Sequence, residues 1–293
     1  MEDEAALIES ARTKLFAARE KRIRPGLDDK VLTAWNALMI EGLAHAARIL
    51  DRPDWLSMAR NALDYLRQIH WRDGRLLATS RDGRAQLPAY LDDYAYLLAA
   101  LLELLQAEFR PGDLVFAQQL ADALLEHFED RTVGGFFFTA HDHEALIHRP
   151  KTGHDGATPS GNGIAAVALQ RLGHLLGETR YLEAARRTFD AFWPQIMRQA
   201  GGCASLIMAL EETLTPPAIV ILRGPASELA EWQQRMARYR TTITLTLPNR
   251  MIGLPPSLAK PETPHVNAWV CQGVSCLAPL AILAELESVV QAS

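Results

Sequence analysis

The chain has 293 residues, of which 35 are acidic and 30 basic, giving a formal net charge of −5. This mild acidity argues against a nucleic-acid partner, and three cysteines are too few for a disulfide scaffold. No stretch is long and apolar enough for a membrane span, and the acidic N-terminus lacks the features of a secretory signal. We therefore expect a cytoplasmic globular protein without a nucleic-acid or membrane partner.

The first two-thirds of the chain predict helices of two kinds that alternate. Three inner helices are apolar on nearly every face and must be covered by protein: 30–50, 91–106 and 163–176. Three outer helices have one apolar stripe and one charged face: 55–69, 114–128 and 181–196. Short links make successive helices antiparallel neighbours. The pattern predicts a mainly α fold, a partial α/α toroid of helical hairpins, with an open solenoid as the competing geometry.

Three longer links interrupt the hairpins. Residues 72–87 contain two Asp-Gly turn signals and predict a small β-excursion. Residues 134–138 predict a short strand, and the polar segment 141–159 predicts a loop. Loops on a rigid scaffold often carry functional sites.

The sequence pattern changes near residue 214. Strands are expected at 218–222, 241–245 and 266–271, and helices at 227–239 and 280–291. We therefore predict two domains, an incomplete α/α toroid over 1–214 and a small α/β unit over 215–293, with the second packed on the outside of the helical layer.

Polar residues gather where the inner helices begin. Inner helices of a toroid are parallel, so their N-termini are expected to share one rim of a concavity. Asp29, Asp93 and Asp155 are the predicted acid–base residues. The helical register aligns Asp92 with the charged Glu103, so Asp92 is expected to face outward and Asp93 inward.

The same rim carries aromatic and amide side chains. Trp35 and Tyr94 are predicted to stack on a ligand, and Asn36, Ser160 and Asn162 to hydrogen-bond it. Carboxylates beside aromatic rings suit a sugar, and acid–base cleavage of a glycosidic bond needs a carboxylate pair. The competing interpretation is that Asp and Ser at these positions only cap helices.

No metal or cofactor is expected. The loop histidines at 141, 143, 148 and 154 lack an H-E-x-x-H spacing, and neither a P-loop nor a G-x-S-x-G elbow occurs. Cys271 and Cys276 have four residues between them, unlike the two of a zinc knuckle. They are expected to lie close together and reduced, with a reversible disulfide across a Gly273 turn as the alternative.

Five motifs together resemble one known family. They are RPGLDDKVLTAWN at 24–36, LDDYA at 91–95, GGFF at 134–137, DGATPSGN at 155–162 and VCQGVSCLAP at 270–279. They resemble the thioredoxin-domain-containing family related to spermatogenesis-associated protein 20. The resemblance implies a thioredoxin-like domain followed by a six-hairpin-glycosidase-like toroid, similar in fold to N-acylglucosamine 2-epimerases and unsaturated glucuronyl hydrolases. Ala37 stands where the family commonly has Gly.

The chain begins just before the Asp-Asp-Lys motif of this family. We therefore expect the thioredoxin-like domain and the early hairpins to be absent. Either the chain is a fragment or a split protein, or a thioredoxin-like domain or another chain completes the ring. The leading hypothesis is a carbohydrate-active or carbohydrate-binding toroid with a small sugar as its ligand. The alternative is a non-catalytic scaffold that works with a thioredoxin-like domain in redox or protein-quality roles.

Overall fold

The computed structural model describes residues 2–239, 242–272 and 275–291. It divides into two compact units, residues 1–30 and 31–293. The first unit consists of helix α1 (Glu2–Arg19) and an extended segment that follows it. Within the described ranges, no helix is both long and apolar enough to cross a membrane.

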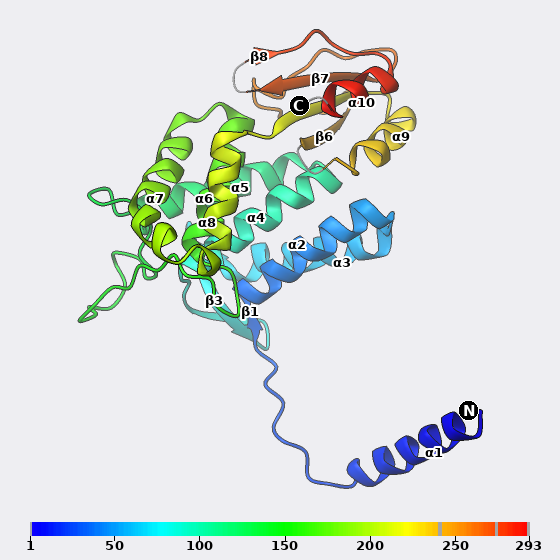
Figure 1. Cartoon of the computed structure of the whole chain (residues 1–293), viewed down its shortest axis with the longest axis vertical. Coiled ribbons are helices and arrows are strands. Elements are labelled where there is room, and N and C mark those ends of the chain that lie inside the picture. Colours follow the sequence, from blue (N-terminus) through cyan, green and yellow to red (C-terminus); the bar gives the residue numbers. More distant parts are fainter. Residues whose placement is uncertain (1, 240–241, 273–274, 292–293) are drawn as a thin grey trace. The chain divides into compact units, whose positions relative to one another are not determined.

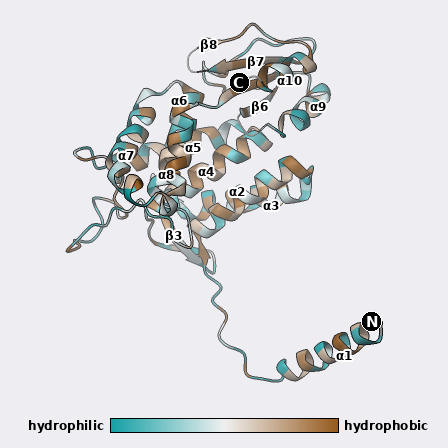
Figure 2. Cartoon of the chain, in the orientation of Figure 1, coloured by the Kyte–Doolittle hydropathy of each residue, from teal (hydrophilic) through white to brown (hydrophobic). Residues whose placement is uncertain are grey.

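The second unit opens with the alternating helices that the sequence predicts. The inner helices are α2 (Thr33–Leu50), α4 (Leu91–Ala107) and α6 (Gly161–Leu176), and the outer ones are α3 (Pro53–Tyr65), α5 (Pro111–His127) and α7 (Thr179–Arg198). α4 packs between α2 and α6, and each inner helix packs against the outer helix that follows it (Figure 1). Hydrophobic residues run along α4, which is buried on nearly every face (Figure 2). The predicted partial α/α toroid is confirmed.

Two further helical pieces complete this layer. α8 (Ala204–Leu214) packs against α6. The end of α3 continues as a single π-helical turn, Leu66–His70, which carries the His70 side chain into the core. Prolines at the first positions of α3 and α5 suit helix starts, because a helix leaves its first N–H groups unpaired in any case.

His70 sits in a fully buried chain of hydrogen bonds. The Thr33 hydroxyl donates to the Leu77 carbonyl (2.6 Å), so its oxygen accepts from His70 Nδ1 (2.7 Å). The Ser80 hydroxyl then donates to His70 Nε2 (2.8 Å) and accepts from Tyr65 (2.9 Å). This network assigns a neutral imidazole with the proton on Nδ1.

We expect this histidine to make stability fall with acidification. Burial lowers the pKa of His70 below its usual 6.5. The unfolded chain therefore takes up the proton at a higher pH than the folded one, and stability is lost as pH drops from about 6.5, by at most about 1.4 kcal/mol per pH unit for one group. Urea unfolding at pH 7.5 and 5.5 tests this. The difference in free energy of unfolding between the two pH values should be smaller in His70→Gln. An unchanged difference would contradict the assignment of a neutral His70.

A small antiparallel sheet is formed by the residues just before α2 and by the chain between α3 and α4. It contains β1 (Val31–Leu32), β2 (Trp71–Arg72), β3 (Arg75–Arg81) and β4 (Arg84–Pro88), with β3 paired to the other three. The predicted β-excursion is therefore confirmed. The strand predicted at 134–138 is wrong: among the residues described there, the only ladder contact is an isolated bridge between Glu129 and Phe136.

The C-terminal residues form a second sheet, in the order β6-β5-β7-β8. β5 (Ala218–Gly224) pairs parallel with β6 (Thr242–Pro248) and antiparallel with β7 (Asn267–Gln272), and β8 is Ser275–Cys276. Helices α9 (Ala226–Met236) and α10 (Leu283–Gln291) complete the segment (Figure 1). The predicted strand start at Thr241 lies outside the described residues.

Alternate residues of β5 pack into two different hydrophobic cores, because successive side chains of a strand point to opposite faces of the sheet. Ile219 and Ile221 join the core of the helical layer, whereas Val220 and Leu222 pack in a second cluster with α9 and α10. The predicted boundary near 214 coincides with the end of α8. The sheet that follows shares part of its core with the helices, and the division into two domains near 214 stays a prediction.

Candidate functional site

The N-termini of the three inner helices meet, as the parallel arrangement predicts. The Ala34 N–H at the start of α2 donates to Asp93 Oδ1 near the start of α4 (2.9 Å). On the other side of α4, Asp92 Oδ1 packs so closely on Gly161, the first residue of α6, that a Cβ there would lie 2.1 Å from it. Only glycine allows this approach. Asp92 and Asp93 thus contact the two neighbouring inner helices.

Asp93 has the contacts of a structural cap. Its two carboxylate oxygens accept from the N–H groups of Ala34 (2.9 Å) and Tyr90 (2.8 Å), and the residue is 5% exposed. Burial raises the pKa of Asp93 to about 7, against the opposing effect of these two donors. The capping interpretation therefore accounts for both oxygens, and the catalytic role predicted for Asp93 stays a prediction.

Asp92 differs from its neighbour. It is half-buried, and the described part of the chain offers it neither a hydrogen bond nor an ion pair. Burial raises the pKa of its carboxyl group to about 6. The expectation that Asp92 points outward is wrong, because its carboxylate packs against α6. A carboxyl group with a pKa near 6 and no fixed partner can act as either a proton donor or a proton acceptor near neutral pH.

Asp155, Ser160 and Asn162 hold the loop before α6 in place. Asp155 accepts from the Ser160 N–H (2.7 Å) and from the Ser205 N–H and hydroxyl (2.9 and 2.5 Å). The Ser160 hydroxyl donates to the Thr152 carbonyl and caps α6. The Asn162 amide is buried. Its oxygen accepts from the Phe136 N–H (2.7 Å), and its nitrogen donates to the Phe136 carbonyl (2.9 Å). These contacts are structural, and the predicted roles toward a ligand remain predictions.

The other predicted residues differ in their exposure and contacts. Tyr94 is fully buried, and its hydroxyl accepts from the Leu76 N–H (2.8 Å), so the expectation that its ring faces a ligand is wrong. Trp35 is 67% exposed, and Asn36 donates to the Leu32 carbonyl (2.8 Å). Asp29 is exposed in the N-terminal unit, and the helix expected from residue 30 begins at Thr33.

A charged pocket at the opposite ends of the inner helices was not predicted. It has a volume of about 340 Å³ and is lined by residues of α2, α4, α6, α8 and β6. Glu103 is 8% exposed and accepts from Arg48 (2.7 Å) and His45 (3.0 Å), so its assignment to an outward face is wrong. Burial, and secondarily the Glu103 charge, raises the pKa of Glu41. Polar residues at helical spacing on α2 could have indicated this pocket.

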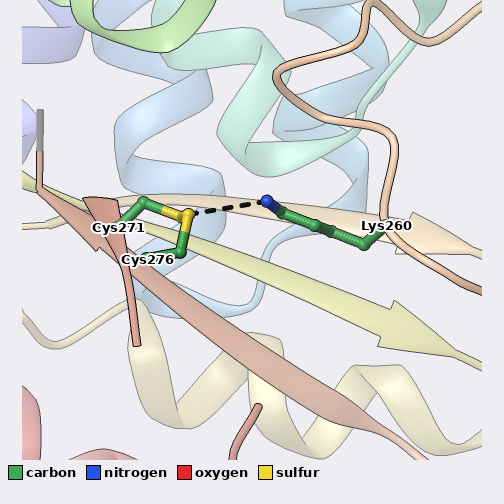
Figure 3. Close-up of a disulfide and its surroundings, with 3 residues drawn as sticks. All are labelled: Lys260, Cys271 and Cys276. Carbon is green, nitrogen blue, oxygen red and sulfur yellow. Dashed lines mark hydrogen bonds between the residues drawn. A yellow bond between two sulfur atoms is a disulfide. The ribbon is translucent and has the colours of Figure 1, made fainter. Parts of the chain in front are cut away.

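The two cysteines of the tail are joined. Cys271 on β7 lies directly opposite Cys276 on β8, and the two form a disulfide (Figure 3). Lys260 Nζ lies 3.5 Å from Cys276 Sγ. The expected proximity is confirmed and the expected reduced state is wrong, because the strand register places the sulfurs side by side. The predicted Gly273 turn lies outside the described residues.

We expect reduction of this disulfide to cost about 2 kcal/mol in free energy of unfolding, the value for closing a short loop. Cys276 is exposed, so a small thiol can reach it. Urea unfolding with and without dithiothreitol measures the difference. A Cys276→Ser variant should show no response to the reductant, and an equal response in both proteins would contradict the prediction.

The second unit has the fold of a partial α/α toroid, and it resembles solved proteins of that fold. The GH76 alpha-mannanase of Bacteroides thetaiotaomicron superimposes with a TM-score of 0.51 at 14% identity, covering 64% of this chain and 54% of that one. A sugar epimerase from a ruminal bacterium gives a TM-score of 0.49 at 12% identity over 57% of this chain and 46% of that one.

At the level of sequence, the chain is a distant homologue of spermatogenesis-associated protein 20. The human protein is 28% identical over 306 residues, which cover 96% of this chain and 38% of the human protein. The chain thus matches less than half of that relative's length. No family model matches the sequence. The resemblance inferred from the five motifs is confirmed.

Proposed function

We propose that the rim where α4 meets α6 binds a sugar and that Asp92 exchanges a proton with it. The observation that carries the proposal is the Asp92 carboxyl group, which is half-buried, has no partner in the described part of the chain and has a pKa raised to about 6. Every other rim carboxylate of the second unit is occupied by backbone or hydroxyl donors.

Two further observations support a sugar as the ligand. The alpha-mannanase that shares the fold acts on a carbohydrate, as its name states. The exposed indole of Trp35 stands next to Ala34, whose N–H binds Asp93, and an exposed aromatic face suits stacking on a sugar ring. Completion of the ring by a further domain or chain is part of the proposal.

Isothermal titration with a panel of mono- and oligosaccharides, followed by turnover assays on those that bind, tests this function. We expect binding that Trp35→Ala weakens and Asp92→Asn alters. Glu41→Gln is the matched control, because Glu41 lies in the charged pocket at the other end of the helices. Binding that depends on Glu41 and not on Asp92 would place the ligand in that pocket and contradict the rim assignment.

The disulfide favours a second candidate function, a scaffold that exchanges thiols with a thioredoxin-like partner. A partner thiolate would attack the exposed Cys276 sulfur, form a mixed disulfide and release Cys271 as a thiolate. The Lys260 ammonium group beside Cys276 favours approach of the anionic thiolate. Absence of sugar binding together with rapid reduction by thioredoxin would favour this function over the first.

A further inference from the structure

A cluster of two histidines and one aspartate lies where α5 ends. His127 is the last residue of α5, and His141 and Asp142 belong to the segment that returns past it. One ligand atom from each lies within 4.8 Å of the others. Two ligands of a tetrahedral zinc ion lie about 3.3 Å apart when each bond is about 2.0–2.1 Å, so small side-chain rotations would bring these atoms to binding distance.

The backbone holds the two histidines together. The His141 N–H donates to the His127 carbonyl (2.8 Å), and the two imidazole rings stack with centroids 5.3 Å apart. The sequence showed His141 and Asp142 as neighbours but gave no sign of His127, which is fourteen residues earlier. The fold therefore supplies the ligand that the sequence pattern lacked.

The His127 ring supplies a buried nitrogen to this cluster. His127 Nδ1 is buried and has no hydrogen-bond partner in the described ranges, and a buried polar atom normally has one. Burial, and secondarily the Arg75 charge, lowers the pKa of His127. The Arg75 hydrogen bond lowers the pKa of Asp142 to about 2.

The charges around the cluster set how tightly a cation can bind. Arg75 makes two hydrogen bonds to Asp142, at 2.5 and 3.0 Å, and its positive charge opposes a second cation. Each carboxylate oxygen keeps a further lone pair, so Asp142 can bind both groups. Glu126, whose carboxylate lies 3.8 Å from His127 Nε2, adds a negative charge.

We propose that His127, His141 and Asp142 bind a divalent transition-metal ion, of which zinc is the best match. Two imidazole nitrogens favour zinc over magnesium or calcium, which prefer oxygen ligands. Three protein ligands leave a fourth position for water. The bound ion would pin the 141–159 loop to the end of α5, and so fix the segment that carries Asp155 to the rim. This proposal does not depend on the proposed function.

Zinc binding to the purified metal-free protein, measured by competition with a chromophoric chelator, tests the site. We expect one zinc per chain, binding weakened at least about tenfold in Asp142→Asn and in His141→Ala, and cobalt(II) absorption bands that both variants lose. His148→Ala, an exposed histidine of the same loop, is the matched control and should bind as the wild type does. Circular dichroism without metal checks that each variant is folded.

A second readout follows the loop itself. Zinc should slow tryptic cleavage after Lys151 in the wild type, and leave it unchanged in Asp142→Asn. Equal zinc affinity in wild type and His141→Ala would overturn the proposal. It would also be overturned if His148→Ala lost as much affinity as His141→Ala, since zinc would then bind scattered surface histidines only.

Discussion

Replacing Asp92 with Asn should lower turnover of a bound sugar by about 10²-fold or more, the usual cost of removing a general acid–base group. Asparagine preserves the shape of the side chain against Gly161 but cannot exchange a proton. The melting temperature should be unchanged or higher, because a carboxyl group whose pKa is raised by burial destabilises the fold once it ionises. Steady-state kinetics and thermal unfolding of the same preparations measure both effects.

The matched variant is Asp93→Asn. Its amide can accept only one of the two backbone N–H groups that Asp93 now satisfies, so we expect a loss of about 1–2 kcal/mol in stability. Turnover per folded molecule should change far less than in Asp92→Asn. A larger catalytic loss in Asp93→Asn, with Asp92→Asn unaffected, would restore the assignment that the helical register first suggested.

The pH profile gives an independent check on Asp92. The pKa of its carboxyl group is about 6, so the wild-type rate should change most steeply near pH 6. That inflection should be missing from any residual activity of Asp92→Asn. An identical inflection in both proteins would assign the titrating group elsewhere.

Replacing Glu103 with Leu should cost about 3–5 kcal/mol in free energy of unfolding, the typical result of removing one partner from a buried ion pair. The side chains of Glu103 and Arg48 are each 9% exposed, and Arg48 has its ion pair with Glu103 (2.7 Å). The single variant would leave the guanidinium buried beside an apolar side chain. Urea unfolding monitored by circular dichroism gives the difference.

The control for Glu103→Leu is the double variant with Arg48→Met. Replacing both partners by apolar groups of similar volume is often nearly neutral, so the double variant should recover most of the lost stability. If the double variant is as unstable as Glu103→Leu, then packing around the pair, and not the unpaired charge, determines the loss.

Local patterns predicted most of the helical layer. α4 and α6 are apolar on every face because neighbours cover them, and that pattern is visible in any window of the sequence. Glu103 is a residue whose position these local patterns did not predict. A single carboxylate inside a helix suggests an exposed face, but His45 and Arg48, more than fifty residues earlier, supply its donors. Pairing between distant segments leaves no periodic signal.

The prediction of a strand at 134–138 was wrong for a related reason. Three consecutive phenylalanines have a high strand propensity, yet Gly134 adopts a φ of +92° and the Arg187 carbonyl lies where its Cβ would stand. The chain therefore turns there against α7, and the Asn162 amide takes the backbone bonds of Phe136 that a neighbouring strand would have made. For the rim, the sequence placed the inner-helix starts to within three residues, but the hydrogen bonds that separate Asp92 from Asp93 come from other elements.

The sheet that shares its core with the helices also has a consequence for folding. The Gln233 side chain caps α4 by donating to the Gln106 and Ala107 carbonyls, and the Thr244 N–H donates to the Gln106 side chain. Residues far apart along the chain thus finish the same helix. If the polypeptide were cut after α8, the N-terminal product would lack the apolar face of β5 that covers its core. The C-terminal product would lack the end of α4 that its side chains bind. We therefore expect the two pieces to unfold together, and a recombination point placed at that junction to separate halves that depend on each other.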